Sequence, residues 1–350
     1  MKTVRPVLGV LEGFYGRPWS ASSRLLMAQW LPALGLDAYL YAPKSDAYLR
    51  KAWHKQWPGS QRDHLAAVAR QCKGSGLAFH VGLSPFELYL DYNRSARSAL
   101  QGKINEIIDL GVSGLAILFD DMPGDLDSLE ARQAEICADV RHWVSDSSIR
   151  LRVCPTYYSD DPILDEIFGQ RPDGYIRSLY EQLDGAYEVF WTGPAVCSET
   201  IGAADLHDVH ADCAGEIAIW DNYPVNDSRA RSPHIYMDDL VGRSSDIGEL
   251  IGSHWCNAMN QPALSLPALA SLAVLYNREA PGARDVQAEA GLNERFIDGC
   301  RVLATRRLDE LSAAQLKGLE SLAGTESVAA LELRDWLSGG YEFDPECLTC

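Results

Sequence analysis

The sequence predicts an α/β protein built as a (β/α)₈ barrel with a C-terminal helical appendage. Eight apolar runs recur at a spacing of roughly 30 to 40 residues, and helical patterns lie between them. Several runs, such as LAILF and IAIW, are almost continuously apolar. A strand needs continuous apolarity when both of its faces are covered, which is typical of a parallel sheet.

The eight expected strands end near residue 257. They are Val7 to Gly13, Asp37 to Pro43, Ala78 to Pro85, Gly114 to Asp121, Arg150 to Thr156, Tyr187 to Gly193, Glu216 to Asn222 and Glu249 to Asn257. Closure into a barrel leaves no exposed sheet edge. An open doubly wound sheet is the alternative, but no GxGxxG motif follows the first run.

Amphipathic patterns between these runs predict the covering helices. The segment from Ser22 to Leu34 has apolar residues near helical spacing, with Ser20 as a candidate N-cap. Asp63 to Cys72 and Ala96 to Leu110 behave in the same way. Strands that alternate with helices are expected to form right-handed βαβ units.

The pattern changes downstream of Tyr276. Residues 284–337 read as helices only, so we divide the chain into a barrel over residues 1–282 and a helical region with a tail over residues 283–350. The tail from Ser338 to Cys350 contains two glycines and a proline and is expected to be disordered.

Composition excludes several classes of partner. The 350 residues carry a formal net charge of -18, which repels nucleic-acid backbones and anionic lipids. No apolar stretch reaches the roughly 18 residues of a membrane span.

Without a recognisable signal peptide, a cytoplasmic location is expected, and the nine cysteines are expected to be free thiols. Cys347 and Cys350 form a terminal CxxC, which lacks the further ligands of a zinc site.

Polar and aromatic residues follow seven of the eight runs. In a (β/α)₈ barrel these strand ends meet at one mouth, where chemistry takes place. The expected tips are Glu12 to Gly16, Tyr41 to Asp46, Phe119 to Met122, Cys154 to Tyr158, Trp191 to Pro194, Trp220 to Asn222 with Asn226 and Asp227, and Trp255 to Asn257. Aromatic rings suit the apolar face of a sugar, while amides and carboxylates suit its hydroxyl groups.

The adjacent pair Asp120 and Asp121 is the most informative of these tips. Crowding of two carboxylates raises one pKa, and the protonated acid can donate to a glycosidic oxygen. A solvated turn or helix N-cap, and a magnesium site, remain open as alternatives. His80 and His254, within the third and eighth runs, are interpreted as residues of the core or of the layer behind the site rather than as ligands.

Seven motifs together resemble glycoside hydrolase family 84, the O-GlcNAcase and bacterial β-N-acetylglucosaminidase family. They are GVLEGFYGRPWS (9–20), YAPKSD (41–46), LFDDM (118–122), CPTYY (154–158), WTGP (191–194), WDNYPVND (220–227) and the asparagine of NAMN (257–260). The resemblance implies a retaining, substrate-assisted mechanism in which the 2-acetamido oxygen of the substrate forms an oxazoline.

The resemblance also implies roles for individual residues. Asp120 would polarise the acetamido N–H, and Asp121 would be the general acid and then the general base. The substrate-binding residues would be Gly13, Tyr15, Lys44, Tyr158, Trp220, Asn222, Asp227 and Asn257. No metal or other cofactor is expected.

The sequence therefore predicts a β-N-acetylglucosaminidase that acts on a GlcNAc-bearing glycan or glycoprotein. A non-catalytic GlcNAc-binding barrel is the alternative, and a metal-dependent barrel enzyme using Asp120 and Asp121 as ligands is a third. The sequence does not indicate an oligomeric state.

Overall fold

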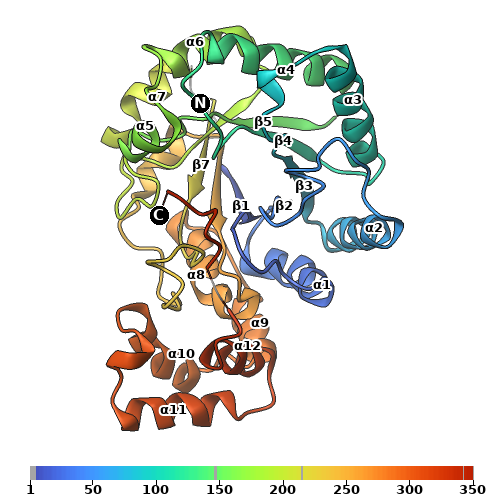
Figure 1. Cartoon of the computed structure of the whole chain (residues 1–350). Coiled ribbons are helices and arrows are strands. Elements are labelled where there is room, and N and C mark those ends of the chain that lie inside the picture. The colour runs from blue at the N-terminus through green and yellow to red at the C-terminus, as the bar shows by residue number, and fades with distance from the viewer. Residues whose placement is uncertain (1–4, 146–147, 214–215, 342, 350) are drawn as a thin grey trace.

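A closed parallel barrel forms the centre of the computed structural model, which describes residues 5–145, 148–213, 216–341 and 343–349. The strands follow chain order, and β8 pairs with β1 to close the barrel (Figure 1). Their bounds are β1 Val7–Glu12, β2 Ala38–Tyr41, β3 Ala78–Leu83, β4 Gly114–Leu118, β5 Arg150–Cys154, β6 Glu188–Trp191, β7 Ile217–Asp221 and β8 Ser253–Asn257. Each predicted run contains one of these strands, so the predicted (β/α)₈ barrel is confirmed.

Helices cover the outside of the barrel. They are α1 Ala21–Trp30, α2 Gly59–Ser75, α3 Arg94–Ile108, α4 Leu129–Trp143, α5 Ile163–Phe168, α6 Tyr175–Leu183, α7 His207–Asp212 and α8 Pro262–Leu275. Short 3₁₀ helices are η1 Leu31–Leu34, η2 Leu88–Leu90, η3 Ala203–Leu206 and η4 Ser245–Glu249. The predicted N-cap is confirmed, because Oγ of Ser20 accepts the N–H of Ser23 at 3.0 Å.

Large side chains fill the interior of the barrel. Trp255 on β8 is fully buried, and a Cβ atom on Gly9 would lie 2.1 Å from its ring, so β1 needs a glycine there. The guanidinium of Arg152 lies 4.7 Å from the Trp255 ring centroid and forms an ion pair with Glu188 at 2.6 Å. His80 contacts Arg152 across 2.9 Å and is buried, which confirms its interpretation as a core residue.

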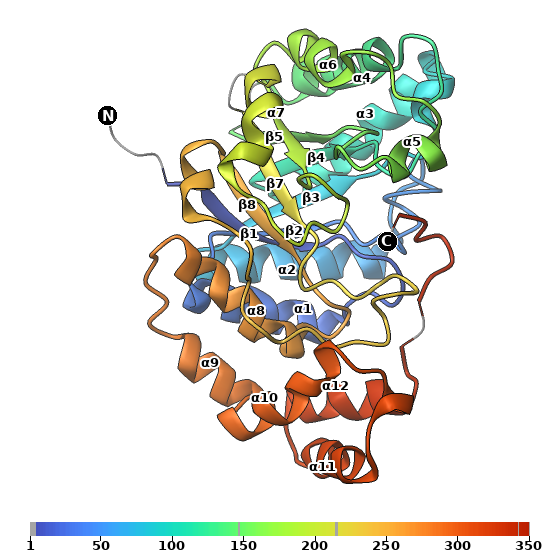
Figure 2. The same cartoon turned by 90° about the vertical axis from the view of Figure 1, so that its left-hand side faces the viewer.

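The helices after α8 pack together beside the barrel (Figures 1 and 2). They are α9 Ala283–Ala290, α10 Glu294–Cys300, η5 Arg301–Ala304, η6 Leu308–Glu310, α11 Ala313–Ala323 and α12 Val328–Leu337. The helical pattern expected over residues 284–337 is therefore present. Helix α8 contacts both β1 and α12, and its side chains are buried over most of its length, because it lies between the barrel and the appendage.

Helix α12 is tied to α8 through Glu332. Its two carboxylate oxygens accept the N–H groups of Ala263 and Leu264 at 3.1 and 3.0 Å. These groups lie in the first turn of α8, where backbone donors have no partner within the helix. The preceding residue, Gln261, forms no side-chain cap, so a residue about 70 positions downstream caps α8.

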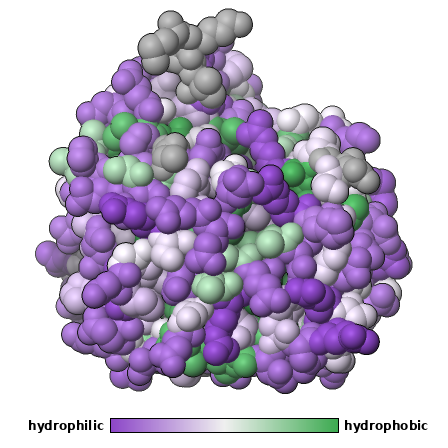
Figure 3. All heavy atoms as spheres, turned by 90° about the horizontal axis from the view of Figure 1, so that it is seen from above, coloured by the Kyte–Doolittle hydropathy of each residue, from purple (hydrophilic) through white to green (hydrophobic). Residues whose placement is uncertain are grey.

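None of the helices in the described ranges combines the length and apolarity of a membrane span. Figure 3 shows one face of the molecule, on which hydrophilic side chains dominate and hydrophobic ones form small separate patches.

The tail differs from its prediction. Residues 343–349, which were expected to be disordered, lie across the barrel mouth, where Cys347 and Thr349 line the cavity described below. Cys350, the other cysteine of the terminal CxxC, lies outside the described residues. The expectation that all the cysteines are free thiols is wrong for Cys197, which is disulfide-bonded. The free cysteines of the described residues are Cys72, Cys137, Cys154, Cys213, Cys256, Cys300 and Cys347.

Candidate active site

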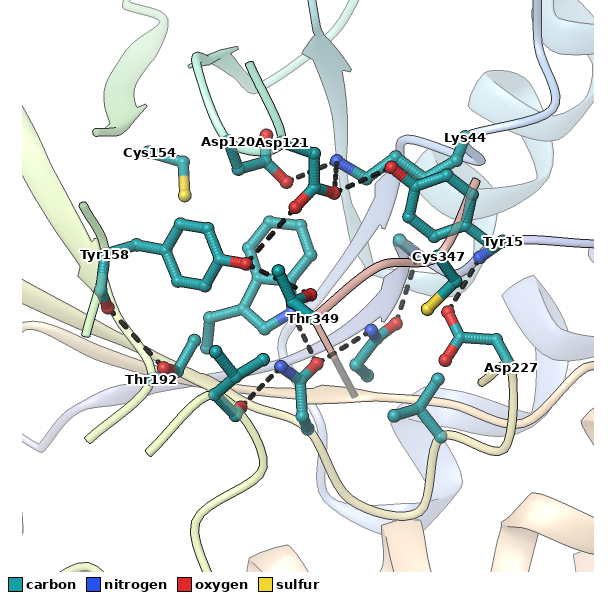
Figure 4. Close-up of a pocket in the computed structure, with 16 residues that line it drawn as sticks. Tyr15, Lys44, Asp120, Asp121, Cys154, Tyr158, Thr192, Asp227, Cys347 and Thr349 are labelled. Atoms are coloured by element: carbon teal, nitrogen blue, oxygen red, sulfur yellow. Dashed lines mark hydrogen bonds and ion pairs between the residues drawn. The ribbon is translucent and has the colours of Figure 1, made fainter. Parts of the chain in front are cut away.

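One cavity opens where the strands end at their carboxyl side. Its lining is Gly13, Tyr15, Lys44, Asp120, Asp121, Cys154, Tyr158, Thr192, Val196, Trp220, Asn222, Val225, Asp227, Asn257, Cys347 and Thr349 (Figure 4). The structure thus brings together all ten residues that the sequence proposed for the site. The roles given to them stay predictions.

The acidic pair follows β4 directly. Asp121 has a φ of 57°, in the left-handed region that aspartate tolerates better than most residues. Neighbouring residues of an extended strand point to opposite faces. The left-handed turn lets two consecutive carboxylates, those of Asp120 and Asp121, face the same cavity.

Lys44 holds the pair together. Its Nζ is ion-paired with Oδ2 of Asp120 and lies 3.6 Å from Oδ2 of Asp121. The other oxygen of Asp120, Oδ1, is buried and has no hydrogen-bond partner among the described residues. Buried carboxylate oxygens are normally satisfied, so this carboxylate has acceptor capacity that the described chain does not use.

Asp121 accepts hydrogen bonds from two tyrosines of the cavity wall. The hydroxyl of Tyr15 donates to Oδ2 at 2.8 Å, and that of Tyr158 donates to Oδ1 at 3.2 Å. Burial favours a raised pKa for Asp121, but the charges of Lys44 and Arg50 and these two hydroxyl donors outweigh it. The pKa of Asp121 is therefore held below the ordinary aspartate value.

This direction differs from the sequence prediction for the pair. Crowding of two carboxylates was expected to raise the pKa of the acid and keep it protonated near neutrality. The prediction considered only the repulsion between Asp120 and Asp121. It did not include the two cations, Lys44 and Arg50, whose charges lower the pKa of Asp121.

Amide groups form a connected floor on the opposite side of the cavity. Asn257 Oδ1 accepts the N–H of Gly13 at 3.2 Å, and its Nδ2 donates to Oδ1 of Asn222 at 3.0 Å. Trp220 Nε1 donates to the same Asn222 oxygen at 3.0 Å. A Cβ atom on Gly13 would lie 2.6 Å from the Trp220 ring, so only glycine fits between strand β1 and this indole.

Asp227 closes the cavity beside Tyr15. One of its oxygens accepts the backbone N–H of Tyr15 at 2.8 Å. Burial raises the pKa of Asp227 to about 6, and the Tyr15 N–H and the charge of Arg231 oppose this shift only in part. Its carboxylate changes charge in a pH range where ordinary aspartates stay ionised.

Sequence reasoning missed Arg50 and the tail. Arg50 donates to the backbone carbonyl of Asp121 at 3.2 Å and to Oγ of Ser84 at 3.2 Å. It lies in the turns after β2, six residues from Lys44, and an arginine in such a loop gives no signal of its own. Cys347 and Thr349 are distant in sequence from every strand tip.

The alternative hypothesis, that Asp120 and Asp121 bind a metal ion, has to account for a lysine that already lies between them. The Nζ atom of Lys44 already lies against both carboxylates, so it supplies the positive charge that a divalent ion would bring. A second set of ligand types, Asp221, His254 and Cys256, lies within 4.8 Å of one another in the core. Both oxygens of Asp221 accept from Arg243, and one also contacts His254, so that carboxylate is already occupied. The expected core role of His254 is confirmed.

Comparisons with known proteins agree with this geometry. A family model of beta-N-acetylglucosaminidases matches residues 8–298. Protein O-GlcNAcase from Rattus norvegicus and from Mus musculus each share 27% identity over 288 residues, which is 80% of this chain and 31% of theirs. The chain thus spans about a third of the length of these relatives.

A solved structure agrees over a larger share of both chains. A mutant of the O-GlcNAc hydrolase from Thermobaculum terrenum superposes with a TM-score of 0.78 at 26% identity. The match covers 97% of this chain and 82% of that one. From the family match over most of its length, the chain belongs to the beta-N-acetylglucosaminidase family of glycoside hydrolases, family 84.

Proposed function

We propose that this protein hydrolyses terminal β-linked N-acetylglucosamine from a glycan or glycoprotein. The observation that carries the proposal is the carboxylate of Asp120, which is paired with Lys44 through one oxygen and has an unused buried oxygen on the other side. An acetamido N–H is a donor that suits such an acceptor. A hydrogen bond to an ionised acceptor is stronger than a neutral one and would polarise the acetamido group.

In the proposed first step, the substrate is its own nucleophile. The acetamido oxygen attacks the anomeric carbon, the bond to the leaving oxygen breaks, and Asp121 gives its proton to that oxygen. Because the nucleophile is tethered to the reacting carbon, its effective concentration is high. The product of this step is an oxazoline in its protonated form, which keeps its N–H hydrogen-bonded to the Asp120 carboxylate, and no metal or organic cofactor takes part.

In the proposed second step, water opens the oxazoline with net retention. Asp121, now ionised, takes a proton from the water as it attacks the anomeric carbon, and the acetamido group is restored. For the first step Asp121 must hold a proton, although its pKa is lowered in this structure. A sugar packed against Asp121 displaces water from it, which shifts the pKa of its carboxyl upward.

The remaining residues hold the sugar in this proposal. Tyr158 supports the acetamido oxygen, while Tyr15 and Trp220 shape the walls. Gly13 through its backbone, and Lys44, Asn222, Asp227 and Asn257, bind hydroxyl groups or the acetamido arm. A cytoplasmic location stays a prediction from the sequence.

The proposal is tested with aryl glycosides of glucosamine that carry different N-acyl groups. Replacing the acetyl hydrogens by one, two and three fluorines makes the acyl oxygen a progressively weaker nucleophile. We expect kcat/KM to fall steadily through the series, and the first-formed product to have the β configuration by NMR. Rates that do not depend on fluorination would exclude the oxazoline, and no turnover of any glycoside would favour a sugar-binding protein instead.

A further inference from the structure

The C-terminal tail, residues 343–349, crosses the barrel mouth and enters the candidate active site. The ring of Phe343 lies 5.1 Å from the guanidinium of Arg229, in the loop after β7. Glu346 is ion-paired with Lys51, in the turns after β2. The tail is therefore held on both sides of the cavity, in segments that follow two different strands.

The end of the tail lies against residues proposed to act on the sugar. Thr349 Oγ1 lies 3.4 Å from the Tyr158 hydroxyl, which also donates to Asp121. The Cys347 side chain lies beside Asp227 (Figure 4). Burial and the negative charges of Asp227 and Asp121 raise the pKa of the Cys347 thiol, so it sits there as a neutral group.

Little space remains in the cavity beside the tail. Its free volume is about 40 Å³. One water molecule needs roughly 10–15 Å³ by the same measure, whereas sites for small organic ligands typically enclose about 300–1,000 Å³. The remaining space holds a few water molecules at most, so an acetamido sugar and the tail cannot occupy the cavity together.

We propose that the tail is an intramolecular competitive inhibitor, which must leave the barrel mouth before a glycoside can bind. This inference rests on the proposed function, since it assumes that the cavity is where the sugar binds. The occupant is an irregular segment with a turn in which the N–H of Cys347 donates to the carbonyl of Asp344 at 3.0 Å. It places a threonine hydroxyl against Tyr158, as in a polypeptide whose sugar has been removed. The tail thus takes the place of substrate and of the deglycosylated product.

Tethering makes such an inhibitor effective although its contacts are weak. Only five residues, 338–342, separate the tail from the end of α12, so its effective concentration at the cavity is in the millimolar range or above. Its exposed ion pair and ring contact contribute little individually. A competitor of this kind multiplies the apparent KM by the ratio of all enzyme to open enzyme and leaves kcat unchanged.

The test compares the full chain with a variant that ends at Tyr341. We expect truncation to lower KM for an aryl N-acetylglucosaminide at least about tenfold, with kcat unchanged. The dissociation constant of a thiazoline analogue of the oxazoline, measured by calorimetry, falls by the same factor. Equal KM values and equal dissociation constants in the two proteins would overturn the inference.

A single substitution in the tail tests its inhibitory role without removing any part of the chain. Glu346→Ala removes the ion pair with Lys51 and is expected to lower KM about two- to fivefold, as suits one exposed ion pair. Glu135→Ala is the matched control, because Glu135 forms a similarly exposed ion pair with Arg97 away from the barrel mouth. A decrease in KM of the same size in both variants would argue against a specific role for the tail.

A synthetic peptide tests whether the tail sequence recognises the cavity. Peptide 343–349, added to the variant ending at Tyr341, is expected to inhibit competitively, whereas the same residues in reversed order do not. If both proteins fail to hydrolyse any glycoside, the proposed function fails. The calorimetric comparison of thiazoline binding then still decides whether the tail blocks the cavity.

Discussion

Lys44 is ion-paired with one carboxylate oxygen of Asp120, while the other oxygen of Asp120 is buried with no hydrogen-bond partner among the described residues. The lysine places a positive charge against the first oxygen, and burial keeps water from the second oxygen. This second oxygen of Asp120 can therefore accept a hydrogen bond from a ligand. The first prediction concerns this oxygen.

Asp120→Asn is expected to lower kcat by about 10²–10³, the range found when one preorganised polar group is removed from an active site. The amide keeps the shape of the side chain but loses the charge that polarises the acetamido N–H. Affinity for a thiazoline analogue should fall as well. Steady-state kinetics with an aryl N-acetylglucosaminide and calorimetry with the analogue measure both effects.

Asp127→Asn is the control for this variant. Asp127 is exposed in the loop after β4 and does not line the cavity. It undergoes the same chemical change at nearly the same place in the chain, so its kinetics should stay at the level of the unmodified protein. If Asp120→Asn bound the thiazoline with unchanged affinity, the acetamido contact assigned to Asp120 would be wrong.

Asp121→Asn is expected to lower the rate of cleavage by an amount that depends on the basicity of the leaving group. General acid catalysis contributes about 10²–10⁴ in rate, and it matters most when the departing oxygen is strongly basic. Cleavage of a methyl glycoside should therefore become undetectable, while a dinitrophenyl glycoside keeps much of its rate of oxazoline formation. The slope of log kcat/KM against leaving-group pKa measures this. A slope that equals that of the unmodified enzyme would remove Asp121 from the acid role.

The strands were predictable because burial on both faces leaves a local signature. In β4 every residue from Gly114 to Leu118 is buried, and the sequence shows this as an uninterrupted apolar run. The site was predictable for a related reason, since parallel strands of a barrel bring their carboxyl ends together. Residues as distant as Gly13 and Asn257 could thus be placed in one cavity before their hydrogen bond was known.

The pKa direction of Asp121 and the position of the tail were not predictable in this way. The first depends on how close Lys44 and Arg50 approach a carboxylate more than 70 residues away. The second depends on weak contacts of an irregular segment, among them Phe343 with Arg229. Neither hydrophobic periodicity nor strand position records such contacts.

Glu332→Ala tests the link between α12 and the barrel. The change leaves the first-turn N–H groups of Ala263 and Leu264 without their acceptors, a loss typical of N-cap removal that costs about 1–2 kcal/mol. The melting temperature should fall by roughly 2–4 °C for each kcal/mol. Burial raises the pKa of Glu332 to about 8, which costs stability at neutral pH, so Glu332→Gln, which keeps one oxygen acceptor without that cost, should lose less. Equal melting temperatures for the alanine variant and the unmodified chain would show that the cap is not stabilising.

Asp227→Asn is expected to stabilise the protein at neutral pH. The pKa of Asp227 is about 6 when folded and about 4 in an unfolded chain. Between these values the folded state holds a proton that the unfolded state has lost, so this group makes stability fall as pH rises through the interval, by about 2–3 kcal/mol in total. An asparagine removes that loss and still accepts the Tyr15 N–H. The melting temperature of the variant should exceed that of the unmodified chain at pH 7.5 and match it at pH 4.

The same substitution should weaken sugar binding, because the ionised carboxylate is the stronger acceptor for a hydroxyl group. A hydrogen bond to a charged group is worth about 1.5–3 kcal/mol, so affinity for N-acetylglucosamine should fall by about 10–100-fold at pH 7.5. In the unmodified protein, affinity should decrease as pH is lowered through 6 and Asp227 becomes protonated. The variant should lose this dependence, which calorimetric titration at pH 5 and pH 7.5 measures. A variant that is stabilised but binds with full affinity would show that Asp227 has no hydroxyl contact, and that its burial beside Tyr15 serves the fold alone.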